Sequence, residues 1–197
     1  MSFTDAHVTK FLKCDISDTV AKYMELHRVS VLHDFRSPVV YSWDLNQKSI
    51  TFERIHRIRS VRDVYIDFMK CRVDKAYASR IFEQAGKTLA LIHRDIRPVV
   101  EPKYWSPSNP DAWAYRKYGG TLVPQNLSSS VILHGDFGFA NLFLSDRAGD
   151  DCQLTVLDPC GDGAVITSDW VLGPRELDIA RMLLNLEGQV PLRQQCI

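Results

Sequence analysis

The spacing of apolar and polar positions predicts alternating strands and helices in the first third of the chain. Residues 7–13, HVTKFLK, mix β-branched and aromatic side chains with polar ones, which is typical of a half-buried strand. In residues 15–35 the apolar positions recur at helical spacing. Two further apolar segments, residues 38–45 and 49–55, are separated by a short polar stretch. The order predicted for this part is therefore strand, helix, strand, strand.

The hydrophobic period becomes helical near residue 60. Residues 60–70 and 74–96 both carry apolar side chains three and four positions apart, as helices that face a core do. This change of period divides the chain into a β-rich part, residues 1–59, and a mainly helical part, residues 60–197.

Three short apolar segments and a final helix complete the pattern. Residues 131–137, 141–145 and 153–159 are separated by turn-forming residues and predict strands, and residues 174–188 return to the helical period. Before them, residues 98–130 form a long loop rich in proline and aromatic residues. A loop of that length is usually functional, and its aromatic side chains either pack locally or form a surface on which an acceptor stacks.

Composition and charge narrow the function classes. Of 197 residues, 45% are hydrophobic and 24% are charged, which is typical of a globular protein. Lys plus Arg and Asp plus Glu balance at 24 each, so we expect no site for nucleic acid or for an acidic membrane surface. The five cysteines form no CxxC pair, and no apolar stretch approaches the roughly 18 residues of a membrane span. We expect a cytoplasmic protein.

Two stretches compete for the role of a catalytic loop. LIHRDIRPVV contains the His-Arg-Asp of protein kinases, and VILHGDFGFANLFL contains His-Gly-Asp. A kinase-type loop places Asn five residues after the catalytic Asp, because the carboxylate faces the attacking hydroxyl while the amide turns toward a magnesium ion. The fifth residue after Asp95 is Val100, which cannot bind a metal, whereas the fifth residue after Asp136 is Asn141. The spacing favours the second stretch.

The segment that follows Asn141 predicts a second metal ligand. We expect the strands on the two sides of the loop to form a hairpin, and a third strand in LTVLDP to deliver Asp158. A carboxylate in this place suits the metal ions that bridge nucleotide phosphates. The Asp-Phe-Gly of residues 136–138 lies inside the catalytic loop and does not take that role.

These motifs resemble those of the aminoglycoside phosphotransferase family of small-molecule kinases. The resemblance is carried by LHGDFGFANLFL, LTVLDP and GPRELDIARML, preceded by AGKTLALIH. It implies an α+β, protein-kinase-like fold with a shortened β-rich N-lobe and a mainly helical C-lobe that carries a catalytic β-hairpin. It also implies ATP and Mg²⁺ as cofactors, with Asp136 as the catalytic base and Asn141 and Asp158 as magnesium ligands.

The same resemblance implies roles for residues that support the loop. His134 and Gly135 resemble its structural supports. Asp178 resembles the acidic residue of the helix that follows the metal strand, which we interpret as structural.

The first half of the chain resembles the nucleotide-binding part of the family. VTKFLK resembles the strand whose lysine contacts the α and β phosphates, with Lys10 preferred over Lys13 and Glu25 as its ion-pair partner. ITFERI resembles the strand and hinge that present backbone groups to adenine, here at Phe52, Glu53 and Arg54.

Three function classes remain open from the sequence. The first is an ATP-dependent phosphotransferase that acts on a hydroxyl of a small molecule such as an aminoglycoside, sugar or amino alcohol. The second is a truncated or pseudokinase-like module that binds nucleotide without turnover. The third is a metal-dependent hydrolase built on His134, Asp136, Asp158 and a further histidine. It is disfavoured because His93, the other histidine of this half, lacks metal-type spacing.

The sequence departs from the family pattern at both ends. No G-x-G-x-x-G occurs, and we expect this chain to lack the pair of strands and the glycine-rich loop that cover the phosphates in the family, as well as the family's later helices. We expect a partner chain to supply the phosphate-covering lid. The acceptor is not identified by any residue pattern.

Overall fold

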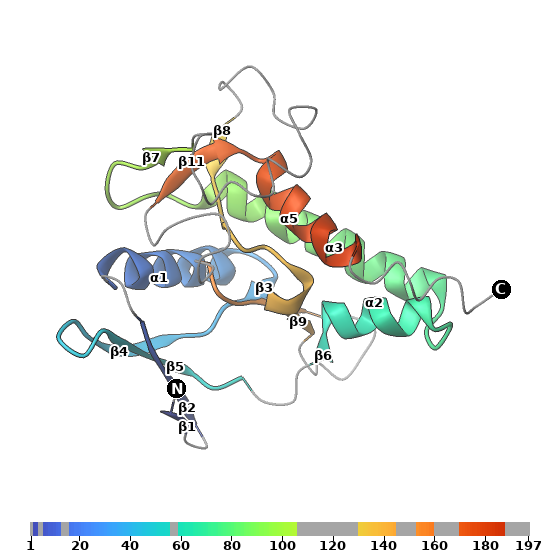
Figure 1. Cartoon of the computed structure of the whole chain (residues 1–197), viewed down its shortest axis with the longest axis horizontal. Coiled ribbons are helices and arrows are strands. Elements are labelled where there is room, and N and C mark those ends of the chain that lie inside the picture. Colours follow the sequence, from blue (N-terminus) through green and yellow to red (C-terminus); the bar gives the residue numbers. More distant parts are fainter. Residues whose placement is uncertain are drawn as a thin grey trace.

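The computed structural model describes residues 2–3, 6–12, 16–55, 59–105, 130–144, 153–159 and 170–187. Within these ranges the chain is a mixed α+β fold with three sheets and four α-helices (Figure 1). Most of the predicted aromatic loop, residues 106–129, lies outside the described residues, as does Lys13.

A four-stranded antiparallel sheet forms the N-terminal part. Its order is β1 (Ser2–Phe3), β2 (His7–Phe11), β5 (Ser49–Glu53) and β4 (Val40–Asp44). Helix α1 (Ser17–Leu32) lies alongside this sheet (Figure 1). A small buried cluster joins the helix to the sheet through Ile16, Val20, Tyr23, Ile50 and Phe52. Because Lys10 stands opposite Ile50 in the register of β2 and β5, its side chain lies on this same face.

The second sheet joins segments that are distant in sequence. Its order is β3 (Phe35–Arg36), β10 (Leu154–Val156), β9 (Leu142–Leu144) and β6 (Arg59–Ser60). β9 and β10 are antiparallel, whereas β3 runs parallel to β10. Since β3 comes from the first sixty residues, this sheet crosses the division that the sequence places near residue 60.

The third sheet corrects the expected hairpin. β8 (Ser130–Ile132) pairs with β11 (Val171–Pro174), and β11 pairs in parallel with β7 (Lys103–Tyr104). The sequence predicts that β8 and β9 form a hairpin, and this prediction is wrong. β9 instead pairs in antiparallel with β10. The physical reason is that Leu133 continues the ladder of β8 by donating its N–H to the Val171 carbonyl oxygen at 2.9 Å.

Three further helices pack with the second sheet in one large core. They are α2 (Val61–Met69), α3 (Lys75–Asp95) and α5 (Glu176–Glu187), with a single 3₁₀ turn, η3 (Phe139–Asn141), before β9. α3 runs across the molecule and passes behind α5 in the view of Figure 1. The large core also takes in Leu26 and Val29 of α1. Helix α1 is thus packed into two cores, and the predicted N-terminal part is not an isolated unit.

The longer elements lie where the hydrophobic pattern predicts them. The strand at 7–13, the helix at 15–35, the strand pair at 38–55, the helices at 60–70 and 74–96 and the final helix are all present. The pattern misses the two-residue strands and β11, which are too short or too irregular for a period to register. None of the described helices has both the length and the apolarity that crossing a membrane requires.

The capping box at the N-terminus of α2 can be tested by mutation. Ser60 accepts a hydrogen bond from the Asp63 N–H at 3.1 Å, and the Asp63 carboxylate accepts one from the Ser60 N–H at 3.0 Å, which is a capping box. We expect Ser60→Ala to lower the free energy of unfolding by about 1 kcal/mol in urea denaturation. The control is Ser42→Ala on the exposed strand β4, which should change stability little. Equal effects of the two substitutions would contradict the capping role.

Candidate active site

One buried carboxylate fixes the start of the candidate catalytic loop. Asp178 on α5 accepts hydrogen bonds from the N–H groups of His134 and Gly135, both at 2.9 Å, and from His93 Nε2 at 2.8 Å. The residue is only 1% exposed. Gly135 has a φ of 88°, a backbone conformation that favours glycine over residues with a side chain. Helices α3 and α5 therefore hold the loop directly after β8.

The charge of Asp178 is retained in this buried place. Burial alone would raise its pKa, but the hydrogen bond and charge of His93 and the hydrogen bond from the Gly135 N–H lower the pKa below its ordinary value of 3.8. His134 lies next to it with 1% exposure, and burial lowers the pKa of this imidazole. His134 Nδ1 accepts from the Asp136 N–H at 3.3 Å, so the proton of the neutral ring is on Nε2.

Asp136 is held by residues from two other elements. Its Oδ1 accepts a hydrogen bond from Arg181 Nε of α5 at 2.6 Å, and its Oδ2 accepts one from Asn141 Nδ2 at 2.9 Å. The same Asn141 amide group also donates to the Asp136 carbonyl oxygen at 3.0 Å. The amide nitrogen of Asn141 is thus committed to Asp136, which leaves its side-chain oxygen as the atom suited to a cation.

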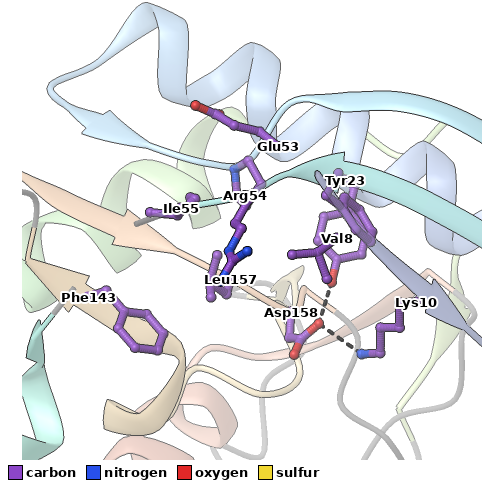
Figure 2. Close-up of a pocket in the computed structure, with 11 residues that line it drawn as sticks. Val8, Lys10, Tyr23, Glu53, Arg54, Ile55, Phe143, Leu157 and Asp158 are labelled. Carbon is purple, nitrogen blue, oxygen red and sulfur yellow. Dashed lines mark hydrogen bonds and ion pairs between the residues drawn. The ribbon is translucent and has the colours of Figure 1, made fainter. Parts of the chain in front are cut away.

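Asp158 lies directly beyond β10 and meets the N-terminal sheet. Lys10 Nζ of β2 lies 3.0 Å from Asp158 Oδ1, and the hydroxyl of Tyr23 on α1 donates to the same oxygen (Figure 2). The backbone of Asp158 has a φ of 48°, in the left-handed region that aspartate tolerates better than most residues. The Asn141 carbonyl oxygen accepts from the Leu157 N–H at 2.9 Å. This bond places Asn141 beside the segment that carries Asp158.

A cavity of about 400 Å³ opens above Lys10 and Asp158. Its walls come from the N-terminal sheet and from the β9–β10 side, and they combine apolar side chains with a few charged ones (Figure 2). The lining residues are Val8, Lys10, Tyr23, Pro38, Phe52, Glu53, Arg54, Ile55, Phe143, Leu157 and Asp158. A concave, largely apolar space lined by a few charged groups is the usual form of a small-molecule site.

Glu25 does not lie where the resemblance implies. Its carboxylate accepts from Arg28 at 2.7 and 2.8 Å and from the Arg97 N–H at 2.7 Å. Burial alone would raise the pKa of Glu25, but these donors lower it. Glu25 is therefore not the ion-pair partner of Lys10, because Tyr23, two residues earlier on α1, is the side chain that faces this part of the site.

The predicted hinge residues line the cavity, but two of their amides are already used. The Glu53 N–H donates to the Val39 carbonyl oxygen at 2.8 Å, and the Arg54 N–H donates to the Ala6 carbonyl oxygen at 2.9 Å. These two N–H groups belong to the sheet and are not available to a base. Phe52 reaches the cavity through its side chain, whose ring lies 4.4 Å from that of Tyr23.

Three residues of the site escaped the sequence analysis: Tyr23, His93 and Arg181. Arg181 stands three positions after Asp178, so the two share one face of α5, and this spacing was the available signal. Nothing local in the sequence marks the partners of Tyr23 and His93, which lie 135 and 85 positions away. Among the described residues no group of three His, Cys, Asp or Glu is placed to hold a metal, so the hydrolase alternative gains no ligand set there.

Comparison with known proteins gives the fold but not the family. No protein-family model matches the sequence, and no curated protein matches it. Among solved structures, the chain is similar to one titled "Glucosamine kinase (crystal form B)", with a TM-score of 0.61 and 14% sequence identity. The match covers 98% of this chain and 55% of that one, so the chain spans about half the length of this structural relative. At this identity the likeness establishes a shared fold alone.

The buried carboxylate of Asp178 can be tested by an isosteric change. Asp178→Asn places an amide among three donors that need an acceptor, and we expect the free energy of unfolding to fall by roughly 3–5 kcal/mol. Urea denaturation at neutral pH measures this loss. Glu83→Gln, which alters an exposed ion pair with Lys87, is the control and should have little effect. A small loss in Asp178→Asn would mean that the loop is fixed by other contacts.

The stability difference between wild type and Asp178→Asn should depend on pH. The pKa of Asp178 is lowered in the folded state, so its stabilisation is present above the ordinary aspartate pKa and is lost as pH falls through the folded-state value. The difference in stability between wild type and Asp178→Asn should therefore be largest near neutral pH and shrink below about pH 4. A difference that grows on acidification would contradict the assignment.

Proposed function

We propose that the chain is an ATP-dependent phosphotransferase that acts on a hydroxyl group of a small molecule. The observation that carries this proposal is the convergence of Lys10 and Asp158 at one end of the cavity, 3.0 Å apart although 148 positions separate them in sequence. A lysine and a carboxylate that meet across two parts of a fold are suited to the phosphates of a nucleotide and to their metal ion. The kinase fold of the structural relative agrees with this reading.

The apolar and the charged residues that line the cavity suit the base and the phosphates of a nucleotide. Val8, Phe52 and Leu157 provide apolar walls against which a base can pack, while Lys10 would contact the phosphates. In this proposal residues 1–59 act as an N-lobe and residues 60–197 as a C-lobe, as in protein-kinase-like folds.

The donor set near Asp158 fits magnesium. The Asp158 carboxylate and the Asn141 side-chain oxygen are hard oxygen ligands of the kind Mg²⁺ prefers, and one backbone hydrogen bond holds their segments together. Asn141 and Asp158 would hold the ion, which supplies charge neutralisation at the phosphates when bound.

Asp136 would orient the acceptor and receive its proton. The hydroxyl oxygen forms a bond to the γ-phosphorus as the bond from that phosphorus to the β–γ bridging oxygen breaks, and ADP leaves. The hydroxyl proton passes to the Asp136 carboxylate. Arg181 and Asn141 hold this carboxylate in one orientation, which is the positioning that phosphoryl transfer mainly requires. The acceptor class includes aminoglycosides, sugars and amino alcohols.

Nucleotide binding is the first test of this proposal. Calorimetric titration of ATP into the purified chain should give binding that depends on magnesium and is abolished by Asp158→Ala. Lys10→Met should weaken it at least roughly tenfold, because a charge-assisted contact to phosphate is lost. Lys87→Met, on the exposed face of α3, is the matched control and should bind as wild type does. An affinity for ATP that is unchanged in both Asp158→Ala and Lys10→Met would show that the nucleotide binds elsewhere.

Turnover separates an enzyme from a binding module. With a panel of hydroxyl acceptors, we expect ATP consumption that falls at least roughly 100-fold in Asp136→Ala while the magnesium-dependent affinity for ATP stays unchanged. Binding without consumption for any acceptor, in a folded sample, would favour the pseudokinase-like module instead.

A further inference from the structure

The Asp158 carboxylate is engaged on one oxygen only within the described part of the chain. Lys10 and Tyr23 both donate to Oδ1, and no described residue donates to Oδ2. The Asp158 side chain is 36% exposed and lines the cavity, so Oδ2 remains accessible from it. Figure 2 shows the two donors approaching the same oxygen from different sides.

Tyr23 is the more firmly placed of the two donors. It is 4% exposed, and its ring packs against Phe52 of β5 at a centroid distance of 4.4 Å. Ile16, Val20 and Ile50 complete the cluster around it. With its ring buried between α1 and the sheet, the hydroxyl has little freedom to leave Asp158.

The two donors also differ in charge. Lys10 is a cation on a flexible stem, and in the proposed function it binds the phosphates, which compete with Asp158 for it. Tyr23 is a neutral donor, so it orients the carboxylate without cancelling the negative charge that attracts a divalent cation. A carboxylate that binds a metal is commonly held by such a partner on its other oxygen.

We propose that Tyr23 is a positioning residue that holds Asp158 so that Oδ2 faces a divalent cation in the cavity. This inference rests on the proposed function. It gives α1 a role through Tyr23, which differs from the role of Lys10 ion-pair partner that the resemblance implied for Glu25. In this role Tyr23 acts through Asp158.

The test compares Tyr23→Phe with Tyr41→Phe. Both remove one hydroxyl, but Tyr41 lies exposed on β4 with its ring against His7. ATP affinity is measured by calorimetry with and without magnesium, and Mn²⁺ binding to the chain alone is measured by electron paramagnetic resonance. We expect Tyr23→Phe to weaken Mn²⁺ binding and the magnesium-dependent ATP affinity about tenfold or more, and to leave metal-free ATP binding and thermal stability near wild type. Tyr41→Phe should match wild type throughout.

The other outcomes can be told apart. Unchanged or tighter cation binding in Tyr23→Phe would show that the hydroxyl does not position Asp158. An equal loss of affinity with and without magnesium would make Tyr23 a structural residue of the cavity wall. If wild type binds no ATP, the proposed function fails, and the Mn²⁺ arm decides alone: a selective loss in Tyr23→Phe supports the positioning role, and no Mn²⁺ binding by wild type refutes it.

Discussion

The ionised carboxylate of Asp178 is the constraint on which the rest of the site depends. It is buried with three donors, one from α3 and two from the backbone of the candidate catalytic loop. A buried charge is stable only where donors surround it, so the two helices and the loop cannot separate without leaving that charge unpaired. The loop conformation is therefore fixed before any ligand contributes. The hydrogen bonds of Asp178 therefore also help to fix the positions of Asp136 and Asn141 in the loop.

From that anchor a series of polar contacts crosses the molecule. α5 carries both Asp178 and Arg181, and Arg181 reaches Asp136. Asn141 joins Asp136 to the segment after β10, where Asp158 meets Lys10 of β2. Asp136 and Asp158 thus each have a cation from another element beside them, which favours the charged form of each carboxylate. The arrangement is a property of the tertiary structure, since no two of these contacts come from one local motif.

The sequence predicts the parts of the site that are encoded locally. The five-residue spacing from Asp136 to Asn141, and the apolar strand that ends near Asp158, can be read because a loop and its flanking strands are continuous in sequence. The partners of those residues cannot be read in this way. Arg181 contacts Asp136 across 45 positions, and Tyr23 contacts Asp158 across 135. Hydrophobic periodicity places Tyr23 on the buried face of a helix, but it does not reveal that its hydroxyl reaches beyond the core. For the same reason it could not distinguish Glu25, which turns to Arg28 and Arg97, from the residue that faces the cavity.

Helix α1 makes the position of Lys10 relative to Asp158 a consequence of packing. Its Tyr23 belongs to the small core with β5, while its Leu26 and Val29 belong to the large core beside β9 and β10. A shift of the helix against either sheet would open one of these close-packed contacts, so the helix fixes the distance between the sheets. Because α1 presents a neutral hydroxyl at this point, Lys10 finds its countercharge in Asp158 itself. In the proposed function the two members of this ion pair bind different groups: Lys10 contacts the phosphates, and Asp158 holds the metal ion. Release of Lys10 toward phosphate leaves Asp158 more negative, which strengthens its attraction for the cation that accompanies the nucleotide.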